Sequence, residues 1–131
     1  MPKTVVIIDD DQDDLDIMKQ AIISVDPAFL CVSFIYPEEA LRVLLSKEFV
    51  VMPDFIFIDI NMPGITGDKC LVALRNHREF DDIAISLYST SMPEAVAEAL
   101  KSAGADFVFE KPVRLKAYAD ILSDILVNGK K

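Results

Sequence analysis

The chain has 131 residues and a hydrophobic content of 52%, which suits one domain with a sizeable core and argues against disorder. Its formal net charge is −9, which argues against direct nucleic-acid binding, because an acidic chain repels phosphates. No apolar run approaches the ~20 residues that a membrane helix needs. Since no signal peptide is recognised at the N-terminus, we expect a soluble, cytoplasmic protein that does not engage a membrane.

The first part of the chain alternates apolar runs with amphipathic segments. Residues 4–8 form a continuous apolar run, which predicts a strand covered on both faces. Residues 13–25 follow as a predicted helix with acidic residues in its first turn and an apolar stripe along one side. A second strand is predicted at residues 30–35, and Pro37 opens a second helix that reaches about residue 46.

The middle of the chain repeats this order. Residues 55–58 are an uninterrupted apolar run and predict a third buried strand. A loop rich in glycine and proline separates this strand from a predicted helix at residues 68–76. A fourth strand is predicted at residues 83–88.

The last part of the chain supplies two more helices and one more strand. Ser91 and Glu94 match a capping box at the start of the fourth helix, and Gly104 ends that helix as a left-handed cap. A fifth strand is predicted at residues 107–109. The fifth helix is expected to bury an apolar stripe spaced at three and four, which comprises Leu115, Tyr118, Ala119, Leu122, Ile125 and Leu126.

Five strand–helix repeats predict an α/β fold of the (βα)5 type. Such repeats build a doubly wound, five-stranded parallel sheet with right-handed crossovers and helices on both faces. No linker, internal repeat or low-complexity segment interrupts the pattern, so residues 1–131 are expected to form a single domain. The tail at residues 128–131 is expected to fray.

Polar residues stand where four of these strands end. Asp9 and Asp10 follow the first strand, Asp59 follows the third, Ser89 the fourth and Lys111 the fifth. Because the carboxyl ends of parallel strands lie on one edge of a sheet, where open α/β folds place their sites, we expect these side chains to meet there.

Three acids and a lysine at one edge indicate a divalent metal and a phosphoryl group. Neighbouring carboxylates repel one another, and Mg²⁺ relieves this repulsion while it bridges phosphate oxygens. An aspartate can attack phosphorus and carry an acyl phosphate, and a lysine can neutralise charge during the transfer. Each residue also has an ordinary explanation, since acids cap helices and most lysines are solvated. Pro112 sets Lys111 apart, because it constrains the adjacent backbone and can favour a cis bond.

Four motifs in one order resemble those of a known family. They are Val6-Ile7-Ile8-Asp9-Asp10-Asp11, the segment from Pro53 to Gly64 with Asp59 inside it, Ser89-Thr90, and Ala103-Gly104-Ala105-Asp106 leading to Lys111-Pro112. Together they resemble the receiver domain of two-component response regulators, and the resemblance covers nearly the whole chain. It implies the flavodoxin-like receiver fold and a phosphoprotein of phosphorelay signal transduction.

The resemblance also implies a role for each acidic residue. Asp59 corresponds to the phosphoacceptor, which takes a phosphoryl group from a histidine kinase or a histidine phosphotransfer protein. Asp9 and Asp10 correspond to the acidic pair that holds Mg²⁺. Asp59 and the backbone carbonyl of Asn61 would complete the protein ligands of the metal.

The remaining site residues would contact the phosphoryl group. Ser89 resembles the hydroxyl switch residue, Lys111 resembles the lysine that pairs with the phosphoryl group, and the backbone amide of Thr90 would help to bind it. The resemblance implies a signalling switch and not an enzyme, with at most self-phosphorylation from a donor and autodephosphorylation. We expect a stand-alone, single-domain receiver without an effector segment after the last helix, whose output passes through an unidentified downstream protein; a receiver excised from a larger protein is the alternative.

One position departs from the family pattern. Receivers often carry an aromatic switch residue three positions before the lysine, and here that position is Val108, between Phe107 and Phe109. Valine has no ring to swing between exposed and buried states. The usual coupling between the hydroxyl residue and the aromatic residue is therefore not expected in its common form.

Two other classes of protein compete with this interpretation. A phosphatase of the haloacid dehalogenase class also uses an aspartate after a buried strand, but it needs a second aspartate two positions on, where this chain has Asn61. A pseudo-receiver would bind partners through the same fold without phosphotransfer. Such proteins lack an acid or the lysine, and this chain lacks none of them.

Overall fold

The computed structural model describes residues 3–46 and 52–128 and contains one five-stranded parallel sheet in the order β2-β1-β3-β4-β5. The strands are β1 (Thr4–Ile8), β2 (Leu30–Phe34), β3 (Phe55–Asp59), β4 (Ala84–Ser89) and β5 (Phe107–Glu110). The helices are α1 (Gln12–Val25), α2 (Pro37–Leu45), α3 (Gly67–Arg75), α4 (Glu94–Ser102) and α5 (Leu115–Ser123). Short helical turns, η1 (Arg78–Phe80) and η2 (Asp124–Asn128), follow α3 and α5.

The predicted fold class is therefore confirmed, and the five strand–helix pairs occur where the sequence indicates them. Most boundaries differ from the predicted ones by one or two residues, which is the usual uncertainty at the ends of elements. Strand ends differ by one residue at most, and β3 and β4 each extend by one residue to include a polar residue, Asp59 and Ser89. Asp59 and Ser89 are therefore the last residues of β3 and β4 and do not belong to the loops that follow.

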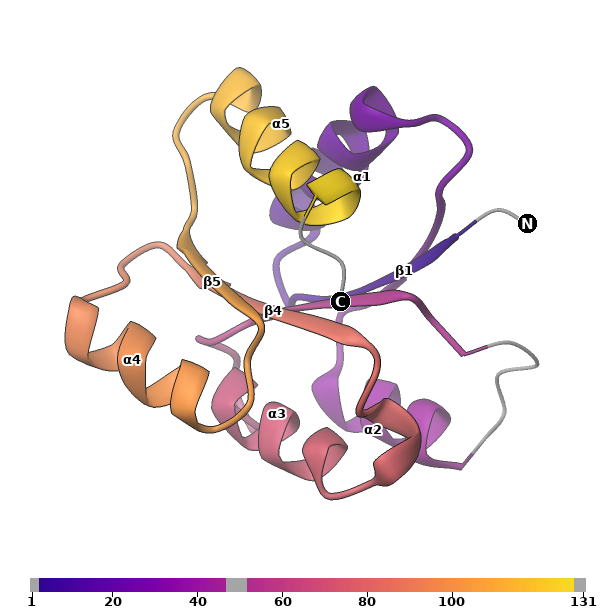
Figure 1. Cartoon of the computed structure of the whole chain (residues 1–131), viewed down its shortest axis with the longest axis vertical. Coiled ribbons are helices and arrows are strands. Elements are labelled where there is room, and N and C mark those ends of the chain that lie inside the picture. Colours follow the sequence, from indigo (N-terminus) through magenta and orange to yellow (C-terminus); the bar gives the residue numbers. More distant parts are fainter. Residues whose placement is uncertain (1–2, 47–51, 129–131) are drawn as a thin grey trace.

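Helices cover both faces of the sheet. In Figure 1, α1 and α5 lie on one face, and α2, α3 and α4 lie on the other. Each face has its own apolar core, and both cores are dominated by fully buried strand residues. The strand pattern of continuous apolar residues follows from this two-sided burial.

Alternation along the strands decides which face each side chain joins. Val5 and Ile7 of β1, Phe55 and Phe57 of β3, and Tyr88 of β4 belong to the core under α1 and α5. Their neighbours in the chain belong to the opposite core. Because successive strand residues point to opposite faces, this assignment also fixes the side on which the residues after each strand emerge.

The start of α4 differs from the prediction. The helix begins at Glu94 with Pro93 as its N-cap, and no side chain caps it, so the capping box of Ser91 and Glu94 does not form. The physical reason is Pro93, which keeps the preceding Met92 out of helical geometry. The Gly104 cap is confirmed: this residue follows α4 with a positive φ of 117°.

The apolar stripe of α5 is also shorter than predicted. Tyr118, Leu122, Ile125 and Leu126 are buried and Ala119 is half-buried, but Leu115 is 44% exposed. Leu115 is the first residue of the helix, and the predicted stripe is buried only from Tyr118 onward. Of the tail expected to fray, Asn128 ends η2, and residues 129–131 lie outside the described residues.

Arg75 connects three segments at the amino-terminal edge of the sheet, the edge away from Asp59 and Lys111. Its guanidinium donates to the carbonyls of Phe80, Ile83 and Gly104 and forms an ion pair with Asp106 at 2.8 Å. These contacts join α3 to the segments before β4 and before β5.

Within residues 3–46 and 52–128, no helix has both the length and the apolar character that a membrane crossing requires.

Candidate functional site

Residues from four strands meet at the carboxyl edge of the sheet. Asp9 directly follows β1, Asp59 ends β3, Ser89 ends β4 and Lys111 directly follows β5. The strands are in parallel register, with Asp59 opposite Tyr88 and Ser89 opposite Glu110. The expected gathering of these residues at one edge is therefore observed.

Strand alternation explains why the carboxylates share one side. Asp9 continues the series of Val5 and Ile7, and Asp59 continues the series of Phe55 and Phe57, so both lie on the face of α1 and α5. Lys111 stands two residues after Phe109 and joins the same side. The ends of the strands predict that these residues lie at the carboxyl edge of the sheet. The alternation of side chains along each strand further predicts the face of the sheet on which they lie.

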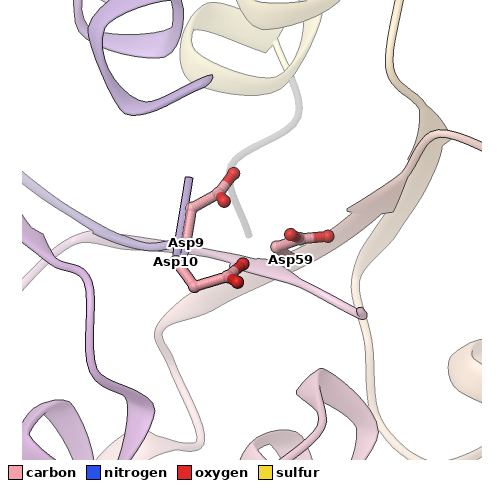
Figure 2. Close-up of side chains that lie close together, drawn as sticks. All are labelled: Asp9, Asp10 and Asp59. Atoms are coloured by element: carbon pink, nitrogen blue, oxygen red, sulfur yellow. The ribbon is translucent and has the colours of Figure 1, made fainter. Parts of the chain in front are cut away.

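Three carboxylates form a compact cluster. One oxygen from each of Asp9, Asp10 and Asp59 lies within 4.8 Å of the others, and Figure 2 shows the three side chains beside the ends of β1 and β3. Asp9 is fully buried and Asp59 is 4% exposed, whereas Asp10 is exposed. Two carboxylates of the cluster are therefore buried, and the third is exposed to solvent.

Burial makes the two inner carboxylates unusually basic. Loss of solvent, followed by the charge of Asp9, raises the pKa of Asp59 to about 7, against the attraction of Lys111. Burial likewise raises the pKa of Asp9, although the N–H of Asp11, the Tyr88 hydroxyl and Lys111 all act to lower it. A cation at this position would relieve the repulsion between the two carboxylates.

Lys111 reaches into the cluster from the fifth strand. Its Nζ donates to Asp14 Oδ2 at 2.7 Å and lies 3.5 Å from both Asp9 Oδ2 and Asp59 Oδ2. Burial disfavours the charged ammonium, but the bond to Asp14 and the neighbouring acids prevail, so the pKa of Lys111 lies above its ordinary value. The described residues contain no cis peptide bond, so the expectation of one before Pro112 is wrong.

Ser89 and Asn61 form a second, polar side of the site. Asn61 Nδ2 donates to Ser89 Oγ at 2.8 Å, and the Asn61 backbone N–H donates to Asp59 Oδ1 at 3.3 Å. Thr90 is exposed and lines a cavity of about 240 Å³ together with Asp10, Asp11, Asp14, Asp59, Asn61 and Lys111. Five of the seven predicted site residues thus line this cavity, and the other two, Asp9 and Ser89, are buried beside it in contact with Lys111 and Asn61.

Two residues of the site were missed by the sequence analysis. Asp14 was explained as a helix-start acid, and it is the shortest ion-pair partner of Lys111. Tyr88 was treated as a strand residue, and its hydroxyl donates to Asp9 Oδ2 at 2.8 Å. One signal was available for Tyr88, because it is the only polar aromatic residue among the predicted buried strands and directly precedes Ser89.

The backbone around Asp59 is held by the start of α3. Gly67 N–H donates to the Ile60 carbonyl at 2.9 Å, and Ile60 N–H donates to the Tyr88 carbonyl at 3.0 Å. A Cβ on Gly67 would lie 2.4 Å from the Asp59 carbonyl oxygen and 2.8 Å from Ile60 Cα. Glycine at this position therefore permits the close approach that fixes the end of β3.

Val108 lies on the opposite face from the aromatic residues of β5. It packs on the core under α2, α3 and α4, whereas Phe107 and Phe109 pack under α1 and α5. The Phe109 ring stacks on Tyr88 at 5.5 Å between centroids and meets Tyr118 edge-on at 6.5 Å. The aromatic residues next to this site thus connect to α5 and not to the face of Val108.

The donor set fits a hard divalent cation such as Mg²⁺. Three carboxylates supply charged oxygens, and the backbone carbonyl of Asn61 is available in the loop that follows Asp59. Mg²⁺ prefers oxygen ligands and keeps several waters, which suits a cluster with one open, exposed side. No cysteine or histidine takes part in the described cluster, so the chemistry does not resemble that of a zinc site.

The chain is similar in sequence to curated proteins that are named stress response regulators. It is 29% identical over 112 residues to stress response regulator protein 1 of Clavispora lusitaniae, covering 86% of this chain and 57% of that protein. It is also 29% identical over 127 residues to the protein of the same name from Candida albicans, covering 95% of this chain and 44% of that protein. The chain thus spans about half the length of the curated relatives it matches.

Solved structures share the fold across most of their length. The phosphorylated cyanobacterial phytochrome response regulator RcpA aligns with a TM-score of 0.87 at 18% identity, covering 100% of this chain and 98% of that one. Response regulator Rcp1, solved in its Mn²⁺-bound form, gives a TM-score of 0.81 at 18% identity, with 95% and 91% covered. The chemotaxis response regulator CheY4 of Vibrio cholerae gives 0.78 at 21% identity, with 95% and 99% covered.

The family match extends over nearly the whole chain. Residues 5–123 match the response regulator receiver domain, and this range includes β2 to β5, all of β1 except Thr4, and every residue of the acidic cluster. Members of this family are signalling switches and typically bind Mg²⁺ in an acidic pocket. The chain belongs to the response regulator receiver domain family of two-component signal transduction.

Proposed function

We propose that the chain is a phosphoacceptor receiver in which Asp59 takes a phosphoryl group from a histidine kinase or a histidine phosphotransfer protein. The observation that carries the proposal is the position of the Asp59 carboxylate, which has oxygens of two further acids within 4.8 Å and lies 3.5 Å from Lys111 Nζ. Receiver domains as a class interact with such phosphodonors and with downstream targets. We further propose that residues 1–131 act as one domain, that the protein works in the cytoplasm, and that phosphorylation changes its affinity for a downstream protein.

The acidic residues would hold the metal. Asp9, Asp10 and Asp59 would bind Mg²⁺ through their carboxylates, and Asn61 would bind it through its backbone carbonyl. Bound Mg²⁺ supplies positive charge that offsets the repulsion between carboxylates and the phosphoryl oxygens. The support for this assignment is the cluster of three carboxylates, with oxygens within 4.8 Å of one another, and the Lys111 ammonium 3.5 Å from Asp59 Oδ2.

Asp59 would act as the nucleophile. A carboxylate oxygen of Asp59 forms a bond to phosphorus, the bond from phosphorus to the donor histidine nitrogen breaks, and the imidazole keeps the electron pair and takes up a proton. The product is an acyl phosphate on Asp59 and a neutral histidine on the donor. Later attack by water on phosphorus returns the free carboxylate and inorganic phosphate.

Lys111, Ser89 and Thr90 would bind the transferred group. The Lys111 ammonium offsets its charge, the Ser89 hydroxyl donates to one of its oxygens, and the Thr90 backbone N–H donates to another. Ser89 Oγ accepts from Asn61 Nδ2 at 2.8 Å, and its own O–H can be donated to a phosphoryl oxygen while that contact is kept.

Phosphorylation from a small donor tests the proposal directly. The protein is incubated with acetyl phosphate and Mg²⁺, and intact-mass spectrometry should detect one added phosphoryl group, which the Asp59→Asn variant should lack. The exposed, first-turn acid Asp13 supplies a matched control, because Asp13→Asn removes one carboxylate outside the cluster and should be labelled normally. No label on the wild-type protein with an active donor and Mg²⁺ would contradict the proposal.

The same experiment separates the two alternatives. Continued release of phosphate from a small phosphoester, over many turnovers, would indicate a phosphatase. Absence of label together with clear Mg²⁺ binding would indicate a pseudo-receiver.

A further inference from the structure

Tyr88 is a buried phenol in contact with the acidic cluster. It lies in β4 opposite Asp59 in the sheet register, and its side chain is fully buried. Its hydroxyl donates to Asp9 Oδ2 at 2.8 Å, across 79 positions of the sequence. The roles assigned above to the acids, Ser89 and Lys111 leave this hydroxyl unused.

The bond from Tyr88 completes the set of donors that orient Asp9. Asp9 Oδ1 accepts the backbone N–H of Asp11 at 3.0 Å, and Oδ2 accepts the Tyr88 hydroxyl. Lys111 Nζ is farther from Oδ2, at 3.5 Å, and is engaged more closely by Asp14 at 2.7 Å. Because Asp9 is fully buried, solvent is not available to replace a donor that is removed.

The ring of Tyr88 is held as firmly as its hydroxyl. Phe109 stacks on it with an interplanar angle of 10°, and Lys111 Nζ lies 5.1 Å from the ring centroid. On the backbone, the Tyr88 carbonyl accepts the N–H of Ile60, the residue after Asp59. A phenol held by stacking and by its backbone presents its hydroxyl at one point, so it can define the orientation of the carboxylate it bonds.

We propose that Tyr88 is a positioning residue of the metal site, whose hydroxyl holds the Asp9 carboxylate in the orientation that binds Mg²⁺. The inference rests on the proposed function only for the identity of the metal. Tyr88 would not contact the phosphoryl group, and it would act through Asp9. Groups that orient a metal ligand in this way commonly change metal affinity by about tenfold or more when they are removed.

The chain offers a matched control for the test. Tyr88→Phe keeps the ring and removes the hydroxyl that bonds Asp9. Tyr118→Phe removes another buried hydroxyl, and within the described part of the chain Tyr118 Oη has no hydrogen-bond partner. Both variants lose one buried oxygen, but only one of them loses a contact with the cluster.

Calorimetric titration with Mg²⁺ is the first measurement. The Kd for Mg²⁺ should rise about tenfold or more in Tyr88→Phe and stay at the wild-type value in Tyr118→Phe. Labelling by acetyl phosphate should be slow in Tyr88→Phe at low Mg²⁺ and should recover when Mg²⁺ saturates the site. An equal Kd in the wild-type protein and Tyr88→Phe would overturn the inference, and so would absence of Mg²⁺ binding by the wild-type protein.

A second measurement does not depend on the stability of Tyr88→Phe. The chain has three tyrosines, so the Tyr36→Phe/Tyr118→Phe double variant retains Tyr88 alone. Mg²⁺ should change the near-ultraviolet absorption of this single tyrosine with the same Kd as the calorimetric titration. A spectrum that stays constant through saturation would count against contact between Tyr88 and a metal ligand.

The outcomes distinguish this inference from the proposed function. If the wild-type protein binds Mg²⁺ and depends on the Tyr88 hydroxyl for its affinity, but takes no label, the positioning role stands and the phosphoacceptor role fails. If it takes label and the two tyrosine variants bind Mg²⁺ equally, the phosphoacceptor role stands and the positioning role fails.

Discussion

At the scale of single residues, the site places the Lys111 ammonium among the acidic cluster and a further acid, Asp14. Asp9 and Asp59 are buried, so their charges are poorly screened, and Lys111 is 3.5 Å from each of them. Asp10 is exposed and can be changed without opening the core. It is therefore the acid whose contribution to metal binding can be measured with least disturbance of the fold.

We expect Asp10→Ala to abolish the stabilisation of the protein by Mg²⁺. A ligand that binds only the native state raises the melting temperature, and this rise disappears when the affinity is lost. Thermal unfolding with and without Mg²⁺ measures the effect. Asp13→Ala is the control, because it removes an exposed acid from the first turn of α1 and leaves the cluster intact. An undiminished rise in Asp10→Ala would show that Asp10 is not a metal ligand.

Sequence reasoning could predict the members of the site but not all the contacts between them. Strand ends placed Asp9, Asp59, Ser89 and Lys111 at one edge, because parallel strands share that edge. The bond from Tyr88 to Asp9 depends on side-chain reach between β4 and the end of β1, and no local pattern encodes it. A helix-start acid such as Asp14 likewise looks the same in sequence whether or not a lysine lies across from it.

At the scale of elements, the approach of α3 to β3 fixes the backbone of the phosphoacceptor candidate. The close contact at Gly67 brings the first turn of α3 against the carbonyl of Asp59. The Gly67 N–H bond to Ile60 keeps that loop in place. The geometry of the site therefore depends on a residue that carries no side chain.

We expect Gly67→Ala to destabilise the protein by about 1–3 kcal/mol, because the added methyl group would overlap backbone atoms that cannot move independently. Urea denaturation measures the loss. Lys69→Ala, at an exposed position of the same helix, should change the free energy of unfolding by less than about 0.5 kcal/mol. A free energy of unfolding in Gly67→Ala equal to that of the wild-type protein would mean that α3 can shift away from β3 at little cost.

A second prediction concerns the junction at Arg75. Arg75→Met keeps much of the side-chain length but removes the donors to three carbonyls and the ion pair with Asp106, so we expect a loss of about 3 kcal/mol. Arg78→Met, at an exposed position, is the control and should be nearly neutral. Equal denaturation midpoints for the two variants would contradict the structural role of Arg75.

The order and type of the elements were predictable because apolar runs and amphipathic segments differ in period. The start of α4 could not be predicted correctly, because two local sequence signals conflict at that position. The spacing of Ser91 and Glu94 favours a cap, but Pro93 excludes helical geometry at the residue before it, and the proline prevailed. The exposure of Leu115 depends on what packs against the start of α5, which is a tertiary property.

At the scale of the whole molecule, the buried acids make folding stability depend on pH. The pKa of Asp59 is raised from its ordinary value to about 7, so between about pH 4 and pH 7 the native protein binds more protons than the unfolded chain. The free energy of unfolding must then fall as the pH rises through this window, and it levels off above the native pKa. The raised pKa of Asp9 contributes in the same direction.

We therefore expect the metal-free protein to be more stable near pH 5 than near pH 8, and Mg²⁺ to remove much of this difference. Asp59→Asn replaces the carboxylate with a neutral group of similar shape, so its stability should vary less with pH than that of the wild-type protein. Urea denaturation in a metal chelator, repeated across this range, measures both curves. A metal-free wild-type protein that gains stability from pH 5 to pH 8 would contradict the sign of the effect.

The separation of side chains between the two faces of the sheet has a consequence for how the protein can vary. Asp9, Asp59 and Lys111 lie on the face of α1 and α5, whereas Val108 packs with α2, α3 and α4. Substitutions on opposite faces share few neighbours, and their effects on stability should add. The surface near α4 can therefore drift in sequence, and so come to suit different partners, while the reactive pocket remains unchanged.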